Sequence, residues 1–241
     1  MRDSDAVVLA IEASQRRQSV ALGTAAWIDE EPVDADRRDI EDLMPAIDRL
    51  ARRRGVRPNA IAAVLVDGGP GGFTGLRIAH AAAQAMSLAL GVPLVQVPAA
   101  AVAREVACRE GRLSPVEPCW VALACKGDEA WTARLDPRLD MDLPLEAASR
   151  RVQAWDPAGA RCLIADEHLP TEWARERDRL GMAAIMLQQD ARGVLEVGRR
   201  LLAKGRVTPP EAMVPLYPRE AEAVRLWRLR HGARTDGTPT A

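Results

Sequence analysis

The stretch from Asp67 to Arg77 is the part of the sequence whose residue types and spacing come closest to chemistry. It reads DGGPGGFTGLR and holds five glycines in eleven residues. A glycine-rich turn between a strand and a helix can present backbone N–H groups to a phosphate. The Lys-Ser/Thr pair that completes a Walker A loop is absent, however. The sequence therefore favours the alternative interpretation, a tight structural turn in which glycine lets two elements pack closely.

The sequence gives little support for a metal site or a catalytic nucleophile. The four cysteines form no Cys-x-x-Cys pair, and the three histidines form no His-x-x-x-His pair. A metallopeptidase would need such paired histidines, and a serine hydrolase would need a Gly-x-Ser-x-Gly turn, which the sequence lacks. We therefore expect no protein-built metal site and no catalytic residue.

Strands and helices on either side of this turn must position it. The apolar run 6–13, the polar turn 14–17 and the run 18–23 predict a hairpin, and residues 25–33 predict a weaker third strand. Residues 39–54 predict an amphipathic helix and residues 61–66 a buried strand. An alanine-rich helix over 75–90 follows, with Thr74 as its expected cap. A short strand over 94–97 and a helix over 99–109 complete the first half.

The pattern restarts after residues 111–118. A second hairpin is expected from strands 120–125 and 129–135, followed by a helix over 145–155 and a strand over 161–165. A helix over 171–180, a strand over 183–187 and a helix over 191–204 come next. Two similar halves of this kind predict an α/β fold with two lobes. We place the lobes at 1–110 and 111–233, with the helix near 190–204 packing back on the first lobe and a disordered tail over 234–241.

Composition is that of an ordinary globular protein. Apolar residues make up 48% of the 241 residues, and 33 basic residues balance 34 acidic ones. Such a balanced charge gives no reason to expect tight binding of tRNA by the chain alone. We find no apolar run that could span a membrane and no signal peptide, and we expect a cytoplasmic protein with no membrane partner.

Two of the predicted helices offer a surface for a partner. The helix over 75–90 carries many alanines, which let another helix approach closely. Packing within the chain is the simpler interpretation; a face shared with a partner's helices is the other. The candidate partner-binding residues are Ile40, Leu43, Met44 and Ile47 on the first helix, and Ile78, Ala79, Ala82, Ala83 and Met86 on the second.

Three stretches together resemble the TsaB (YeaZ) family. They are the opening strand–turn–strand at 8–23, the glycine-rich turn with its following helix and strand at 66–103, and PLYPRE at 215–220. The central stretch is the specific one, and Gly72 stands where that family usually has serine. The residues that fall on the family motif are Pro70, Gly71, Phe73, Thr74, Gly75 and Arg77.

The resemblance implies an actin-like (ribonuclease H-like) fold in which each lobe is a mixed sheet opened by a β-hairpin and flanked by helices. It also implies a non-catalytic scaffold that dimerises with a TsaD-like transferase, which adds threonylcarbamoyl to adenosine 37 of tRNAs reading ANN codons. A TsaE-like ATPase joins that assembly, tRNA is met only through the complex, and the chain alone forms a homodimer. No cofactor is implied, with ATP or ADP expected only weakly or at the partner interface.

The sequence departs from the family at three places. Glu12 and Ala13 replace an opening Asp-Thr, the position where ATP-binding members of the fold hold an aspartate near magnesium. Asp39 replaces a frequent histidine, and the hairpin around Lys126 differs from the family's. These changes lower the expectation of nucleotide binding by the chain itself.

Two other functions stay open. One is an independent kinase or ATPase of the same fold, although the second lobe has no glycine-rich phosphate turn. The other is a binding module that works only as a homodimer. The basic segment 220–234 around Trp227 is either an RNA-contacting tail or a solvated helix end.

Overall fold

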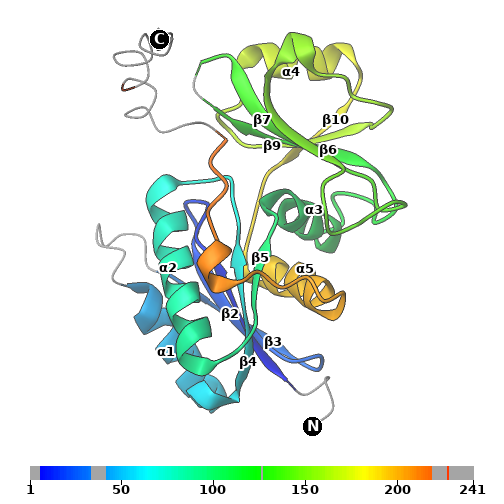
Figure 1. The fold of residues 1–241 in the computed structure, drawn as a ribbon. Helices are drawn as coiled ribbons and strands as arrows, with labels where there is room; N and C mark the ends of the chain where they lie inside the picture. Colours follow the sequence, from blue (N-terminus) through cyan, green and yellow to red (C-terminus); the bar gives the residue numbers. More distant parts are fainter. Residues whose placement is uncertain (1–5, 34–41, 126, 219–226, 228–241) are drawn as a thin grey trace, which may run out of the picture.

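The computed structural model describes residues 6–33, 42–125, 127–218 and 227. The described chain forms two five-stranded sheets, one above the other in Figure 1, with helices around and between them. Residues 1–5, 34–41, 126, 219–226 and 228–241 lie outside the described residues. The predicted disordered tail, most of the basic C-terminal segment, and the candidate residues Asp39 and Ile40 are therefore among those not described.

The first sheet has the strand order β3-β2-β1-β4-β5. It is built from β1 (Val7–Glu12), β2 (Ser19–Gly23), β3 (Ile28–Pro32), β4 (Ile61–Asp67) and β5 (Leu94–Val97). β1, β2 and β3 form an antiparallel meander, while β4 and β5 run parallel to β1. The carboxyl ends of β1 and β4 therefore lie at the same edge, where the glycine-rich turn begins.

The second sheet has the order β10-β9-β6-β7-β8. Its strands are β6 (Cys119–Ala124), β7 (Glu129–Leu135), β8 (Glu146–Arg151), β9 (Cys162–Ala165) and β10 (Ala183–Met186). β6 and β7 form the expected hairpin, and β9 and β10 run parallel to β6. Both sheets thus combine an antiparallel meander with parallel strands, which confirms the predicted α/β fold of two similar lobes.

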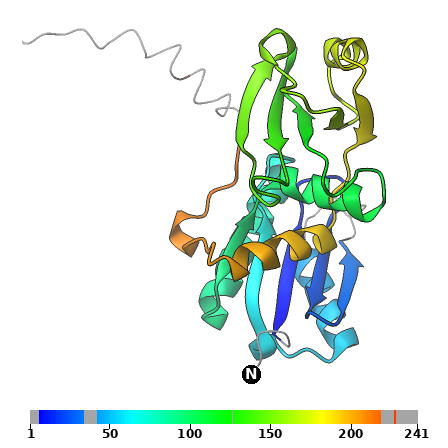
Figure 2. The ribbon, with the colours of Figure 1, turned by 90° about the vertical axis from the view of Figure 1, so that its right-hand side faces the viewer.

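Helices cover both faces of the first sheet. α1 (Leu43–Arg54) and α2 (Phe73–Leu90) lie on one face, and α5 (Ala191–Ala203) lies on the other (Figures 1 and 2). α3 (Ala99–Arg109) lies between α5 and the second sheet, and α4 (Thr171–Arg179) packs at the far end of the second lobe. The last long helix, α5, therefore returns to the first sheet after the chain has built the second one.

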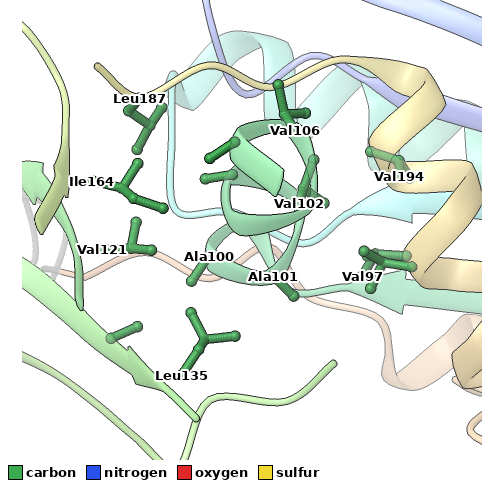
Figure 3. Close-up of a cluster of buried hydrophobic side chains, with 14 of the residues drawn as sticks. Val97, Ala100, Ala101, Val102, Val106, Val121, Leu135, Ile164, Leu187 and Val194 are labelled. Atoms are coloured by element: carbon green, nitrogen blue, oxygen red, sulfur yellow. The ribbon is translucent and has the colours of Figure 1, made fainter. Parts of the chain in front are cut away.

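One apolar core joins the two sheets. Buried side chains of α3, among them Val102 and Val106, contact α5 on one side and the second sheet on the other (Figure 3). The same core includes Val121 from β6 and Ala10 from β1. Burial of apolar surface stabilises by about 25 cal/mol per Å², so the two lobes stabilise each other through α3.

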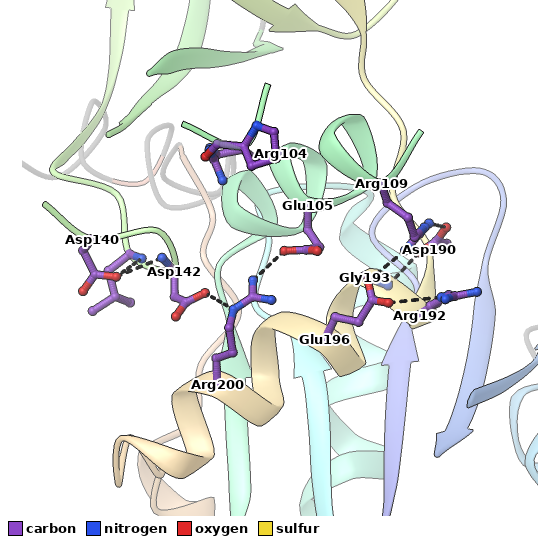
Figure 4. A network of polar contacts seen from close by, with 12 residues as sticks. Arg104, Glu105, Arg109, Asp140, Asp142, Asp190, Arg192, Gly193, Glu196 and Arg200 are labelled. Carbon is purple, nitrogen blue, oxygen red and sulfur yellow. Dashed lines mark hydrogen bonds and ion pairs between the residues drawn. The ribbon is translucent and has the colours of Figure 1, made fainter. Parts of the chain in front are cut away.

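Ion pairs surround this shared core (Figure 4). Arg200 on α5 donates to Glu105 on α3 and to Asp142 on the β7–β8 loop. The Asp142 side chain is fully buried and also accepts from Lys204 at 2.8 Å. These pairs connect α5 to elements of the second lobe, which adds polar contacts to the apolar link.

Residues 207–218, here called the strap, run from the end of α5 back across the edge of the first sheet and towards the second (Figure 1). The Thr208 N–H donates to the Leu94 carbonyl oxygen on edge strand β5 at 2.7 Å. At its far end, the Ser149 hydroxyl on β8 donates to the Pro218 carbonyl oxygen at 3.0 Å. The strap therefore covers a sheet edge and connects the two lobes.

Two local predictions were wrong. Residues 145–155, expected as a helix, form strand β8 and a short 3-10 turn over Val152–Ala154. β8 pairs antiparallel with β7 from Glu146 to Arg151, and these backbone hydrogen bonds override the helical preference of Glu, Ala and Arg. The second correction concerns α2, which begins at Phe73, two residues before the predicted start.

Candidate functional site

The glycine-rich turn packs directly on the turn of the first hairpin. A Cβ atom at Gly71 would lie 2.4 Å from the Ser14 carbonyl oxygen, and one at Gly75 would lie 2.1 Å from that of Ala13. The Gly72 N–H donates to the Ser14 carbonyl oxygen at 2.7 Å. Any side chain would push these two backbones apart, so the glycines serve close packing.

The start of α2 differs from the expected capped helix. Gly72 is the N-cap residue, with an extended backbone and no side-chain hydrogen bond. Thr74, predicted to cap the helix, instead lies exposed within its first turn. The prediction that Thr74 caps α2 was therefore wrong. The contact of Gly71 and Gly72 with Ser14 makes the helix begin two residues before the predicted start.

Two stretches that carried the family resemblance meet in space. The Phe73 ring lies 5.1 Å from the Tyr217 ring, and the Arg77 guanidinium lies 4.1 Å over Phe73. The Leu216 N–H donates to the Gly68 carbonyl oxygen at 2.8 Å. The aromatic and cationic residues of the motif therefore hold the strap against the glycine-rich turn.

A pocket of about 180 Å³ lies between the lobes at this point. It is smaller than the roughly 300–1,000 Å³ usual for small-molecule sites. The lining residues are Ser14, Gln15, Pro70, Gly71, Gly72, Leu123, Ala124, Asp166 and Pro218. The one charged side chain among them is the Asp166 carboxylate, which accepts from the backbone N–H groups of Ala124 and His168. None of the described residues that line the pocket has a cationic side chain that could pair with a phosphate.

Behind the pocket lies a buried pair of acids, Glu12 at the end of β1 and Asp67 at the end of β4. Both side chains are fully buried. One oxygen of Glu12 accepts from the Ser14 N–H at 2.7 Å and contacts the Ser14 hydroxyl at 2.6 Å. Asp67 accepts from the Gly69 N–H at 2.6 Å. The turns that follow the two strands thus occupy Oε1 of Glu12 and Oδ1 of Asp67, whereas Oε2 of Glu12 is buried without a hydrogen-bond partner among the described residues.

Burial sets the charge of this pair. Loss of solvation raises the pKa of Glu12 to about 7, and it raises the pKa of Asp67 well above its usual value, with the charge of Glu12 adding to the effect. Only Glu12 was singled out from the sequence. The signal that could have found Asp67 is its place at the carboxyl end of the neighbouring parallel strand.

The candidate partner-binding residues divide into two groups. Leu43 and Ile47 on α1 and Ala79 and Ala83 on α2 are buried under the helices, against the first sheet. Their side chains are not on the surface, because α1 and α2 use these faces to cover the sheet. Met44 is half exposed at 52%, and the partly buried members are Ile78, Ala82 and Met86.

An outer face of α2 is left on the surface. Ala81, Ala85, Leu88 and Ala89 are exposed at the i, i+4, i+7 and i+8 positions that share one helix face. By contrast, the outer face of α1 carries charged residues such as Arg49 and Arg53, which pair with acids of the β3 edge. The small apolar face of α2 is therefore the part of the predicted surface that a partner could reach.

No cluster of three or more metal-ligating side chains occurs in the described part of the chain. Within the same residues, no helix is both long and apolar enough to cross a membrane.

Comparison with known proteins starts with sequence. The model of the family described as TsaD, tRNA N6-adenosine threonylcarbamoyltransferase, matches residues 31–127. Transferases of that name from two strains of Anaeromyxobacter dehalogenans are each 41% identical over 63 residues, or 26% of this chain. That match covers 19% of each relative's length, so the chain matches about a fifth of these proteins.

Solved structures match over far more of the chain. YeaZ from Pseudomonas aeruginosa superposes with a TM-score of 0.68 at 25% identity, covering 88% of this chain and 99% of YeaZ. The chain is YeaZ-like. A Pseudomonas aeruginosa protein described as similar to peptidase YEAZ gives a TM-score of 0.70 with the same coverage. The resemblance to the TsaB (YeaZ) family is thereby confirmed, and with it the two-lobed fold.

Proposed function

We propose that this YeaZ-like chain is a non-catalytic scaffold subunit in the synthesis of threonylcarbamoyladenosine on tRNA. In this proposal it dimerises with a TsaD-like transferase, which modifies adenosine 37 of tRNAs that read ANN codons. The observation that carries the proposal is the match to YeaZ over 88% of the chain. The match of the TsaD family model to residues 31–127 also supports a role in this tRNA modification. The matched span includes α1, α2 and the glycine-rich turn.

The interlobe site supports the non-catalytic part of the proposal. Its pocket holds about 180 Å³ and is lined by one carboxylate and no cationic side chain. Glu12 and Asp67, the acids at the ends of β1 and β4, are fully buried behind it. A kinase or ATPase acting alone would need room for a nucleotide and partners for its phosphates, so we place any ATP or ADP at the interface with the partner.

The outer face of α2 is the proposed contact with the transferase. Alanines at 81, 85 and 89 would let a partner helix approach closely, and Leu88, exposed at 69%, would supply apolar area. Half-exposed Met44 at the start of α1 would extend this surface. In the absence of the transferase, the same face would pair with a second copy of the chain.

The remaining partners follow from this assembly. A TsaE-like ATPase would join the heterodimer, and tRNA would bind the complex rather than this chain alone. The near-neutral net charge of −1 agrees with that division, because tight binding of a polyanion needs a basic surface.

Substitution on the exposed face tests the proposal without disturbing the fold. Ala85→Arg adds a long charged side chain at an exposed position of α2, and we expect it to weaken binding of the TsaD homologue from the same genome at least tenfold. Ala203→Arg makes the same change at an exposed alanine of α5 and is the matched control. Affinity would be measured by isothermal titration calorimetry, after circular dichroism has shown that both variants are folded. Equal affinities of the two variants for the homologue would refute the α2 interface.

Ala83→Arg is unsuitable for this test. Ala83 is fully buried against the first sheet, so the arginine would unfold the lobe rather than report on the interface.

A further inference from the structure

The turn of the first hairpin carries two adjacent arginines, Arg16 and Arg17. Both are exposed, and neither side chain has a hydrogen-bond or ion-pair partner among the described residues. The backbone of this turn is held from two sides. The Ser14 carbonyl oxygen accepts the Gly72 N–H at 2.7 Å, and the Ser14 hydroxyl lies 2.5 Å from Oε1 of Gln189. The turn therefore presents two unpaired cations directly beside the glycine-rich turn.

The first turn of α2 adds a cationic and aromatic stack. The Arg77 guanidinium lies 4.1 Å over the Phe73 ring, which in turn lies 5.1 Å from the Tyr217 ring. Phe73 is 49% exposed. Arg77 is also exposed, and it has no carboxylate partner in the part of the chain that the structure describes. Aromatic rings and guanidinium planes are the surfaces on which proteins stack unpaired RNA bases.

Positive charge gathers on the elements that meet here, although the chain as a whole has a net charge of −1. Neither α2 nor the hairpin turn 14–17 contains an aspartate or glutamate. The strap contains one acid, Glu211, in the short turn that accepts a hydrogen bond from Gln84. Gln84 lies seven positions beyond Arg77, or about 10 Å along the helix.

The acids close to the hairpin turn are engaged elsewhere. Asp166 lines the adjoining pocket, where its carboxylate accepts two backbone N–H groups. Glu12 and Asp67 are fully buried behind that pocket, and burial raises the pKa of both carboxyls, which reduces their negative charge near neutral pH. The positive charge of the exposed arginines is therefore left for a partner.

We propose that Arg16, Arg17, Arg77 and Phe73, here called the arginine patch, form a contact surface for single-stranded RNA. Arg16 and Arg17 bind backbone phosphates, and an unpaired base extends the stack of Arg77 on Phe73. The identity of the RNA rests on the proposed function, which makes it the anticodon loop of the tRNA substrate. A loop offers unpaired bases, whereas a duplex keeps its bases stacked inside the helix.

The position of the patch suits a contact made within the complex. Arg77 and Ala81 are four residues apart and share one face of α2, so the patch continues the exposed face proposed for the transferase. An RNA held by the transferase would therefore reach the patch at the edge of that interface. Three arginines supply too few phosphate contacts for tight binding, so the chain alone should bind RNA weakly and only at low salt.

Binding of an anticodon stem-loop tests the arginine patch. Fluorescence anisotropy of a fluorescein-labelled stem-loop would be measured with the full chain at about 50 mM salt and again at about 200 mM. We expect the double variant Arg16→Ala/Arg17→Ala to bind at least fivefold more weakly than the unmodified chain at the lower salt. The slope of log K against log salt should also become shallower by roughly 1.4, because each contact with a single strand contributes about 0.7.

The matched control is the double variant Arg57→Ala/Arg206→Ala. It removes the same charge from two exposed positions outside the patch, and it should bind within twofold of the unmodified chain. Arg77→Lys keeps the charge but removes the guanidinium plane, so we expect at least threefold weaker binding of the stem-loop. The duplex stem without its loop should bind the unmodified chain at least fivefold more weakly than the stem-loop does.

Four results would each overturn the proposal. They are no measurable binding by the unmodified chain at low salt, equal affinities of the two double variants, equal affinities for duplex and stem-loop, and displacement of the RNA by an equal charge of polyglutamate. The last would indicate a surface for acidic protein segments instead. Because these measurements use the chain without the transferase, failure of the scaffold proposal, which is judged by complex formation, is recognised separately.

Discussion

Replacement of Gly75 by alanine tests whether the glycine-rich turn is a packing device. Gly75 lies in the first turn of α2, where alanine would ordinarily stabilise a helix by about 1 kcal/mol. Here the new Cβ would lie 2.1 Å from the Ala13 carbonyl oxygen, a backbone atom that cannot rotate away. Overpacking of a core costs about 1–3 kcal/mol, and a rigid backbone contact belongs at the upper end. We therefore expect Gly75→Ala to lower the free energy of unfolding by about 2 kcal/mol.

Gly193→Ala is the matched control. Gly193 is also a buried glycine in the first turn of a helix, but its Cβ would meet only side-chain atoms, Cγ2 of Val106 at 3.0 Å and Oδ1 of Asp190 and Cγ1 of Val102 at 3.2 Å. Those side-chain atoms can shift, unlike a backbone oxygen, so the expected change is within about 1 kcal/mol of zero. Urea denaturation followed by circular dichroism would give both values, with the m-value as a check on two-state unfolding. A Gly75→Ala protein as stable as the parent would refute the packing explanation and favour a turn with room for a ligand.

Two further predictions concern buried polar groups. Asp142→Ala should destabilise the chain by about 2 kcal/mol in the same urea assay, because it leaves the half-buried Arg200 without one of its two carboxylate partners; stability equal to the parent's would show that the ion pair does not connect the lobes. His80 is buried and donates from Nδ1 to the Leu76 carbonyl oxygen, and burial lowers its pKa below 6.5. The unfolded chain therefore takes up this proton first, so the contribution of His80 alone lowers the melting temperature as pH drops below about 6.5, opposite in sign to the contribution of Glu12 with its raised pKa. In His80→Gln that part of the acid dependence should be gone; an unchanged acid dependence would assign it to other groups.

Secondary structure was predicted correctly from the sequence where the local residue pattern agrees with the tertiary structure. The apolar run at 61–66 and the hairpin strand at 129–135 were predicted because their side chains are buried in the sheets and their turns carry glycine or polar residues. β8 was missed because it is an exposed edge strand of EAASRR, whose residues favour a helix. Only the backbone of β7 makes this segment a strand, and a single sequence does not show that pairing.

The candidate site was predictable in part for the same reason. The glycine-rich turn was recognised from its composition, and the structure brings its Phe73 against Tyr217, a contact across more than half the chain. Gln189 could not have been identified, because its hydrogen bond to Ser14 joins residues 175 positions apart. The burial of Ala79 and Ala83 was likewise hidden, since an alanine-rich helix gives no clear sign of which face covers the sheet.

The most direct test of the scaffold proposal is the mass of the assembly that the full chain forms. Size-exclusion chromatography with light scattering would be run on the chain, the TsaD homologue from the same genome and their mixture. The account predicts a stable peak with the mass of a heteromer, and a peak of twice the 26.2 kDa chain mass when the chain is alone. Separate elution of the two proteins, with and without ATP, would contradict the scaffold proposal while leaving the YeaZ-like fold unaffected.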